Sequence, residues 1–153
     1  MRLIKLKVRN VASFEDEEVC FDDLKYPVFC FGRTGAGKTT LFIDAITAAL
    51  FKKAYGKKDI QLFREIVMAG KKTAELELEF EVGEDRYIIK RILPRQGTSE
   101  AKLYRIFDGR PVLVSHGQKV DEEVKRLIGM DFEAMLYANI VRQGEVYDLI
   151  EKR

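Results

Sequence analysis

The start of the chain alternates between apolar and charged residues. Ile4, Leu6 and Val8 occupy alternate positions, and two lysines and an arginine stand at the positions between or after them. A period of two residues places successive side chains on opposite faces of a β-strand. This segment therefore predicts a strand with one buried face, and residues 17–21 predict a second strand after it.

The same alternation returns in the middle of the chain. Over residues 74–81 an alanine, two leucines and a phenylalanine alternate with four glutamates, and the segments RYIIKRIL and AKLYRIF follow. Gly83, Gly97 and the Asp108-Gly109 dipeptide separate these runs, and such residues favour tight turns. We predict an antiparallel meander.

Residues 28–51 follow a different pattern. Segment 28–31 is an uninterrupted apolar run, which is typical of a strand buried on both faces. Over residues 38–51 apolar side chains recur at spacings of three and four, which predicts an amphipathic helix. The predicted order is therefore strand, glycine-containing loop, helix.

Helices are also predicted near the end of the chain. Residues 118–128 predict a helix with Gly129 as its C-cap, and Asp131 predicts the N-cap of another. Residues 52–70 form a basic connector, and the closing letters EVYDLIEKR begin a further helical pattern.

Composition narrows the class of protein. The 153 residues suit one domain, and 46% hydrophobic with 34% charged residues is typical of a globular protein. Lysine and arginine total 27 against 25 acidic residues, so charge alone does not indicate nucleic-acid binding. Cys20 and Cys30 form neither a redox pair nor a disulfide framework. The apolar runs are too short for a membrane span, and no signal-peptide core is apparent.

Residues 32–39 read GRTGAGKT and match the phosphate-loop pattern G-x-x-x-x-G-K-[ST]. Glycines let successive backbone N–H groups turn toward an anion, the Lys38 ammonium reaches the β- and γ-phosphates, and the Thr39 hydroxyl holds Mg²⁺. The helix that begins at Lys38 adds the positive end of its dipole. We predict a site for ATP and Mg²⁺.

The other half of an ATPase site is missing from the sequence. Hydrolysis usually requires a second acidic residue at the end of an apolar strand. The nearest candidate, Asp108, follows a strand that contains Arg105 and enters an Asp-Gly turn, so we interpret it as a hairpin residue. No Gly-Gly dipeptide occurs, which excludes a Ser-Gly-Gly signature.

The segment GRTGAGKTTLFIDAI resembles the phosphate loop of the SbcC / Rad-fifty family of double-strand-break repair ATPases, relatives of SMC proteins and ABC ATPases. IKLKVRNVASFED, AELELEFEVGEDRYIIKRIL and IVRQGEVYDLIEKR resemble the family's first strand and turn, its β meander, and its Q-loop before a coiled coil. The likeness is strong over residues 1–51 and 137–151. It implies an α/β fold, the N-terminal half of an ABC-type P-loop NTPase head with an accessory antiparallel β-sheet.

The resemblance also implies site residues. It makes Lys38 and Gln143 catalytic, and gives Thr39 and Gln143 to the magnesium ion. The nucleotide contacts that it implies are Ser13, Gly32, Arg33, Thr34, Gly35, Ala36, Gly37, Lys38, Thr39 and Thr40. Ala12 stands where some members carry arginine, which argues against a charged contact there. The loop lacks the Asn-Gly-Ser form of SMC proteins, which favours the repair branch.

The resemblance implies partners and a place in the cell. Residues 1–153 would be a single N-terminal ATPase lobe, cut where a coiled coil begins, and it would hydrolyse ATP only with a C-terminal lobe carrying signature and Walker B motifs. Two heads would sandwich ATP and Mg²⁺ as a homodimer and regulate an SbcD / Mre-eleven type nuclease on DNA bound without sequence preference. The implied location is the cytoplasm near the nucleoid, or the nucleus in a eukaryote, with no membrane contact.

Three other functions remain open. An SMC-type chromosome clamp uses the same ATP chemistry without a nuclease. An ABC transporter motor would carry its signature and Walker B motifs in one chain, and a small-molecule P-loop kinase would need lid arginines and leave Gln143 without a role.

Several basic residues have two interpretations. His116 lies in VLVSHGQ, which resembles an ABC histidine switch but precedes the predicted Q-loop, so we interpret it as a histidine of a surface loop. The lysines of FKKAYGKKDI either solvate a helix end or contact DNA phosphates. The same choice applies to Lys90, Arg91 and Arg95 on the predicted meander.

Overall fold

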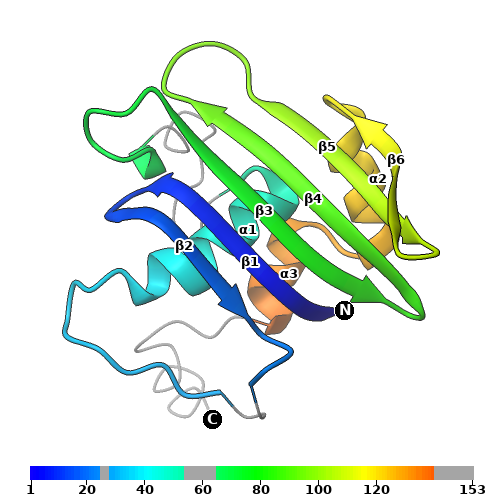
Figure 1. The fold of residues 1–153 in the computed structure, drawn as a ribbon, viewed down its shortest axis with the longest axis horizontal. Helices are drawn as coiled ribbons and strands as arrows, with labels where there is room; N and C mark the ends of the chain where they lie inside the picture. The colour runs from blue at the N-terminus through cyan, green and yellow to red at the C-terminus, as the bar shows by residue number, and fades with distance from the viewer. Residues whose placement is uncertain (25–27, 54–64, 140–153) are drawn as a thin grey trace, which may run out of the picture.

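The computed structural model describes residues 1–24, 28–53 and 65–139, which build one antiparallel sheet with helices behind it (Figure 1). The strand order is β2-β1-β3-β4-β5-β6. The strands are β1 (Arg2–Val11), β2 (Phe14–Cys20), β3 (Thr73–Val82), β4 (Asp85–Pro94), β5 (Glu100–Phe107) and β6 (Arg110–His116). The helices are the π-helical turn η1 (Thr40–Asp44), α1 (Ala45–Phe51), α2 (Lys119–Ile128) and α3 (Phe132–Asn139).

The alternating sequence determines which face of the sheet is buried. Leu6 pairs with Leu78 across β1 and β3, and Leu78 pairs with Ile89 across β3 and β4. These three side chains are fully buried. Since side chains alternate across a strand, the charged residues between them lie on the outer face. The predicted strand pattern and meander are confirmed, with β2 beginning earlier than the predicted second strand.

The predicted turns are confirmed as well. Asp108 (φ 48°) and Gly109 (φ 73°) are the two residues between paired Phe107 and Arg110. Two left-handed residues form the hairpin turn that matches the twist of the flanking strands. Asp108 is therefore a hairpin residue, as predicted.

The helical predictions hold in the described residues. The chain is helical from residue 38 through α1, where residues 45–50 are buried. Gly129 (φ 76°) closes α2 with its N–H donating to the Lys125 carbonyl at 2.9 Å. The Asp131 carboxylate accepts the Ala134 N–H at 2.9 Å, as an N-cap does. None of the described helices is long and apolar enough to cross a bilayer, and the pattern EVYDLIEKR lies outside the described residues.

The prediction for segment 28–31 is wrong in this chain. The segment is not assigned to a strand, and Val28, Phe29 and Phe31 are 42%, 74% and 88% exposed. The rings of Phe29 and Phe31 stack on each other, with centroids 6.4 Å apart. A strand buried on both faces needs neighbours on both sides. The six described strands pair antiparallel among themselves and provide none for this segment.

Candidate nucleotide site

Two left-handed glycines shape the predicted phosphate loop. Gly35 has φ of 80° and Gly37 has φ of 82°, a conformation that strains any residue with a Cβ. Between them, Ala36 donates its N–H to the Arg33 carbonyl at 3.1 Å and closes a tight turn. Glycine at positions 35 and 37 thus has a direct structural reason, and Gly37 is one of the two glycines that the motif requires.

The loop leads into the N-terminus of a helix. The Leu41 N–H donates to the Gly37 carbonyl at 2.8 Å, in the i to i−4 pattern of a helix. The N–H groups of Lys38, Thr39 and Thr40 precede that bond and have no carbonyl within the helix to donate to. A helix N-terminus with such groups is suited to an anion.

Lys38 folds back over the loop. Its ammonium donates hydrogen bonds to the carbonyls of Gly32 at 2.8 Å and Arg33 at 2.9 Å. A Cβ at Gly32 would lie 3.7 Å from the Lys38 Nζ and 3.6 Å from its Cδ. The loop therefore holds a cation against its own backbone, beside the N–H groups of the helix start.

Ser13 lies beside the loop although it is distant in the sequence. It belongs to the turn between β1 and β2, and its Oγ would lie 3.5 Å from a Cβ placed on Gly37. Asn10 (φ 54°) and Ala12 (φ 51°) give this turn its shape. The structure thus brings Ser13 and the phosphate loop together, while its contact with a nucleotide stays a prediction.

The donor set suits ATP with Mg²⁺. Thr39 is exposed at the start of the helix, and a hydroxyl oxygen is a hard ligand of the kind that Mg²⁺ accepts beside phosphate oxygens. In the part of the chain that the structure describes, no group of three or more His, Cys, Asp or Glu side chains could hold a metal by itself. The other predicted magnesium ligand, Gln143, lies outside the described residues.

Arg91 is a buried structural residue, which excludes the DNA contact considered for it. It is 2% exposed, and its Nε donates to the Ala49 carbonyl at 2.6 Å while an Nη donates to the Leu50 carbonyl at 3.0 Å. The same Nη is 2.5 Å from the Asp121 carboxylate. Burial lowers the pKa of Arg91, whereas Asp121 raises it. Arg91 thus neutralises the negative C-terminal end of the helix that follows the phosphate loop.

Arg95 and Lys90 are also engaged within the chain. Arg95 donates to the carbonyls of Val67, Met68 and Lys71 at 2.7, 2.9 and 2.9 Å. Lys90 is 2.8 Å from the Glu77 carboxylate. The sequence indicated only two roles for these residues, a solvated surface or a DNA contact. It did not reveal a structural role within the chain, because sequence spacing does not show which backbone carbonyls folding brings close.

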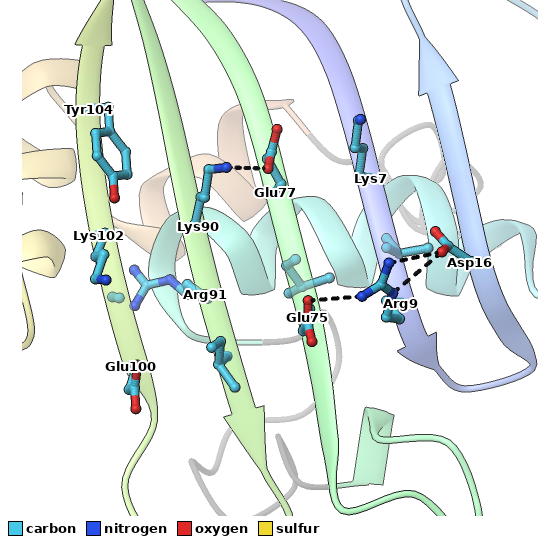
Figure 2. A pocket seen from close by; sticks show the side chains of 14 residues that line it. Lys7, Arg9, Asp16, Glu75, Glu77, Lys90, Arg91, Glu100, Lys102 and Tyr104 are labelled. Carbon is cyan, nitrogen blue, oxygen red and sulfur yellow. Dashed lines mark hydrogen bonds and ion pairs between the residues drawn. The ribbon is translucent and has the colours of Figure 1, made fainter. Parts of the chain in front are cut away.

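The outer face of the sheet carries alternating basic and acidic side chains that form ion pairs. Figure 2 shows Arg9 between Asp16 and Glu75, and Lys90 beside Glu77. These residues line a pocket of about 320 Å³. Arg9 is 3.2 Å from the Asp16 carboxylate and 3.8 Å from that of Glu75. Acidic partners therefore offset these cations, which argues against a phosphate-binding surface here.

The remaining candidates are resolved in part. His116 is exposed, so its surface position is confirmed, but it is the last residue of strand β6, paired with Lys102, and does not lie in a loop. Lys53 lies over the Phe132 ring at 5.4 Å, a cation–π contact at the end of the helix. The other lysines of that segment beyond residue 53 lie outside the described residues.

Comparisons with known proteins identify the family. A family profile described as an AAA domain matches residues 5–152. The chain belongs to this AAA domain family. Among curated relatives, the DNA double-strand break repair Rad50 ATPase of Thermoplasma acidophilum is 32% identical over 98% of the chain, which spans 16% of that relative. That of Methanopyrus kandleri is 32% identical over 96% of the chain, again 16% of the relative.

A third relative agrees with these two. The Rad50 ATPase of Sulfolobus acidocaldarius is 29% identical over 95% of the chain, and the chain spans 16% of its length. The predicted resemblance of this AAA-domain chain to the SbcC / Rad-fifty family is therefore confirmed. The chain spans only 16% of the length of each of these three proteins.

Proposed function

We propose that this AAA-domain chain is the ATP-binding N-terminal half of a DNA double-strand break repair ATPase. The observation that carries the proposal is the loop with two left-handed glycines, which holds the Lys38 ammonium at the start of a helix. The repair role comes from relatives that are named for it. The fold proposed for the complete head is an α/β P-loop NTPase of the ABC type.

The residues have distinct roles in this proposal. The backbone N–H groups at the start of the helix orient the phosphates, and Lys38 moves its hydrogen bonds from the loop carbonyls to phosphate oxygens. Thr39 and Gln143 hold Mg²⁺, which neutralises charge on the phosphates when bound. Ser13 approaches the nucleotide from the turn between β1 and β2.

The same proposal gives segment 28–31 a partner. We propose that residues 1–153 form a single lobe, and that a C-terminal lobe of the same ATPase covers this exposed apolar run and supplies the signature and Walker B motifs. Exposed phenylalanines at 74% and 88% support this view, because large exposed apolar groups mark sites of association. Two completed heads then dimerise around ATP and Mg²⁺ and regulate an SbcD / Mre-eleven type nuclease on DNA.

Nucleotide binding by the chain tests the first step. Titration with a fluorescent ATP analogue and Mg²⁺ should show binding that Lys38→Ala weakens by about 100-fold, a typical cost for a charged phosphate contact. Lys90→Ala is the matched control, since it removes a lysine that pairs with Glu77. Equal affinities for the two variants would contradict the proposal.

Hydrolysis tests the need for the second lobe. The chain alone should release negligible phosphate from ATP, and addition of the C-terminal lobe should restore turnover. Fast turnover by the chain alone would overturn the half-site proposal. Capture of a nuclease by the completed head would separate the repair role from an SMC-type clamp.

A further inference from the structure

The aromatic ring of Phe14 lies directly against the phosphate loop. A Cβ built on Gly37 would stand 2.8 Å from the Phe14 Cε2 and 2.9 Å from its Cζ, and its nearest other neighbour would be the Ser13 Oγ at 3.5 Å. Approaches below 3.0 Å are essentially never made by real Cβ atoms. Position 37 therefore requires glycine twice, once for its φ of 82° and once for the ring.

The turn that carries Phe14 is fixed from its other side. The Ala12 N–H donates to the Ile66 carbonyl at 2.6 Å, and the Met68 N–H donates to the Asn10 carbonyl at 2.8 Å. Asn10 and Ala12 both have positive φ, which costs energy for residues with a Cβ and persists only where surrounding contacts hold it. These two bonds supply such contacts.

Arg95 anchors the segment that holds the turn. Its guanidinium donates to the carbonyls of Val67 and Met68, and its Nε donates to that of Lys71. Val67 forms a β-bridge with Val11, next to the turn. A continuous set of hydrogen bonds and contacts thus runs from Arg95 through residues 66–68 and the turn to Gly37.

We propose that Phe14 is a positioning residue of the phosphate loop, and that Arg95 supports it through residues 66–68 and the β1–β2 turn. The inference rests on the proposed nucleotide function. A loop held in one conformation before binding loses less conformational freedom when it takes the phosphates. Removal of the ring leaves the loop to be ordered by the ligand.

The first experiment measures the loop without any nucleotide. Amide hydrogen exchange over residues 32–41 should be about tenfold faster in Phe14→Ala than in the wild-type chain, since local opening becomes easier. Phe107→Ala is the control, because Phe107 is 62% exposed in the hairpin between β5 and β6. Unchanged exchange in Phe14→Ala would overturn the proposal whether or not ATP binds.

The second experiment measures affinity for the fluorescent ATP analogue at a temperature where circular dichroism shows every variant folded. Phe14→Ala should weaken binding about fivefold, Phe14→Leu less, and Phe107→Ala not at all. Arg95→Met should weaken binding about threefold, whereas Arg105→Met, which breaks an exposed pair with Asp85, should not. Phe14→Leu keeps an apolar side chain at this position, so it tests the proposal even if Phe14→Ala unfolds.

A double-mutant cycle isolates the contact itself. Gly37→Ala should cost less affinity in the Phe14→Ala chain than in wild type, because only the backbone strain remains once the ring is gone. Additive losses would count against the proposed contact. If Lys38→Ala leaves affinity unchanged, the nucleotide function fails. If Lys38→Ala weakens binding as expected but the Phe14 variants match wild type, only the positioning role fails.

Discussion

The antiparallel sheet and segment 28–31 are both rich in apolar residues, yet they end in opposite environments. Leu6, Leu78 and Leu103 of the sheet are 0% exposed, whereas Phe29 and Phe31 are 74% and 88% exposed. The strands β1, β3, β4 and β5 supply neighbours for these leucines through their own pairing and through helix α1, whereas Val112, Leu113 and Val114 of the edge strand β6 are 43–52% exposed. Segment 28–31 pairs with none of the described strands, so the difference shows that hydrophobicity predicts burial only where a partner surface exists.

This contrast has an energetic consequence. Full burial of a phenylalanine side chain contributes about 1.5 to 3 kcal/mol relative to exposure. Two exposed phenylalanines next to the phosphate loop therefore provide a substantial driving force for association with the proposed C-terminal lobe.

The largest effect is expected from truncating one phenylalanine on each side of the comparison. Phe80→Ala removes a fully buried ring from β3 and should lower the free energy of unfolding by about 3 to 5 kcal/mol. Phe31→Ala should change it by less than about 0.5 kcal/mol, because the ring is already in water. Urea denaturation measures both free energies of unfolding. Equal losses for the two variants would contradict the difference in burial between the sheet and segment 28–31.

Arg91 tests whether the sheet and the helix after the phosphate loop are one structural unit. Arg91→Met should lower the free energy of unfolding by about 2 to 3 kcal/mol, since the carbonyls of Ala49 and Leu50 lose a buried charged donor. Arg105→Met removes an exposed arginine and is the control. A loss no greater than that of the control would show that the helix end does not depend on Arg91.

The reactivity of one cysteine in each region, Cys20 in the sheet and Cys30 in segment 28–31, compares the two environments. Burial first, and Glu18 second, raise the pKa of Cys20 in β2, so less of its reactive thiolate exists near neutral pH. Cys30 is exposed in segment 28–31. A thiol reagent should modify Cys30 about tenfold faster or more, as mass spectrometry of Cys20→Ser and Cys30→Ser variants would measure.

The two cysteines also test the proposal that a C-terminal lobe covers segment 28–31. Addition of the C-terminal lobe should slow modification of Cys30 and leave that of Cys20 unchanged. Equal protection of both cysteines would point to a general change of the chain rather than to coverage of the segment.

The smallest effect is expected on the outer face of the sheet. Lys90→Gln should change the free energy of unfolding by less than about 1 kcal/mol, because an exposed ion pair contributes little in water. Glu77→Gln should have a similar effect, and added salt should reduce both. Thermal denaturation at two salt concentrations measures this, and a large loss would show that the outer face also contributes to the core.

The sequence by itself was sufficient for most local structure. Alternation identified β1, β3, β4 and β5 but not β6, whose sequence RPVLVSH does not alternate. The glycine spacing identified the phosphate loop, and Asp131 and Gly129 marked helix ends that the structure confirms. These features depend on residues close together in the chain, where backbone geometry limits the choices.

Tertiary structure alone decided which long-range contacts form. It buried Arg91 against the end of α1, placed the Phe14 ring beside Gly37, and left segment 28–31 exposed. No periodicity encodes these outcomes, because each depends on a surface contributed by a distant segment. A side chain is buried or held only when folding brings such a surface to it.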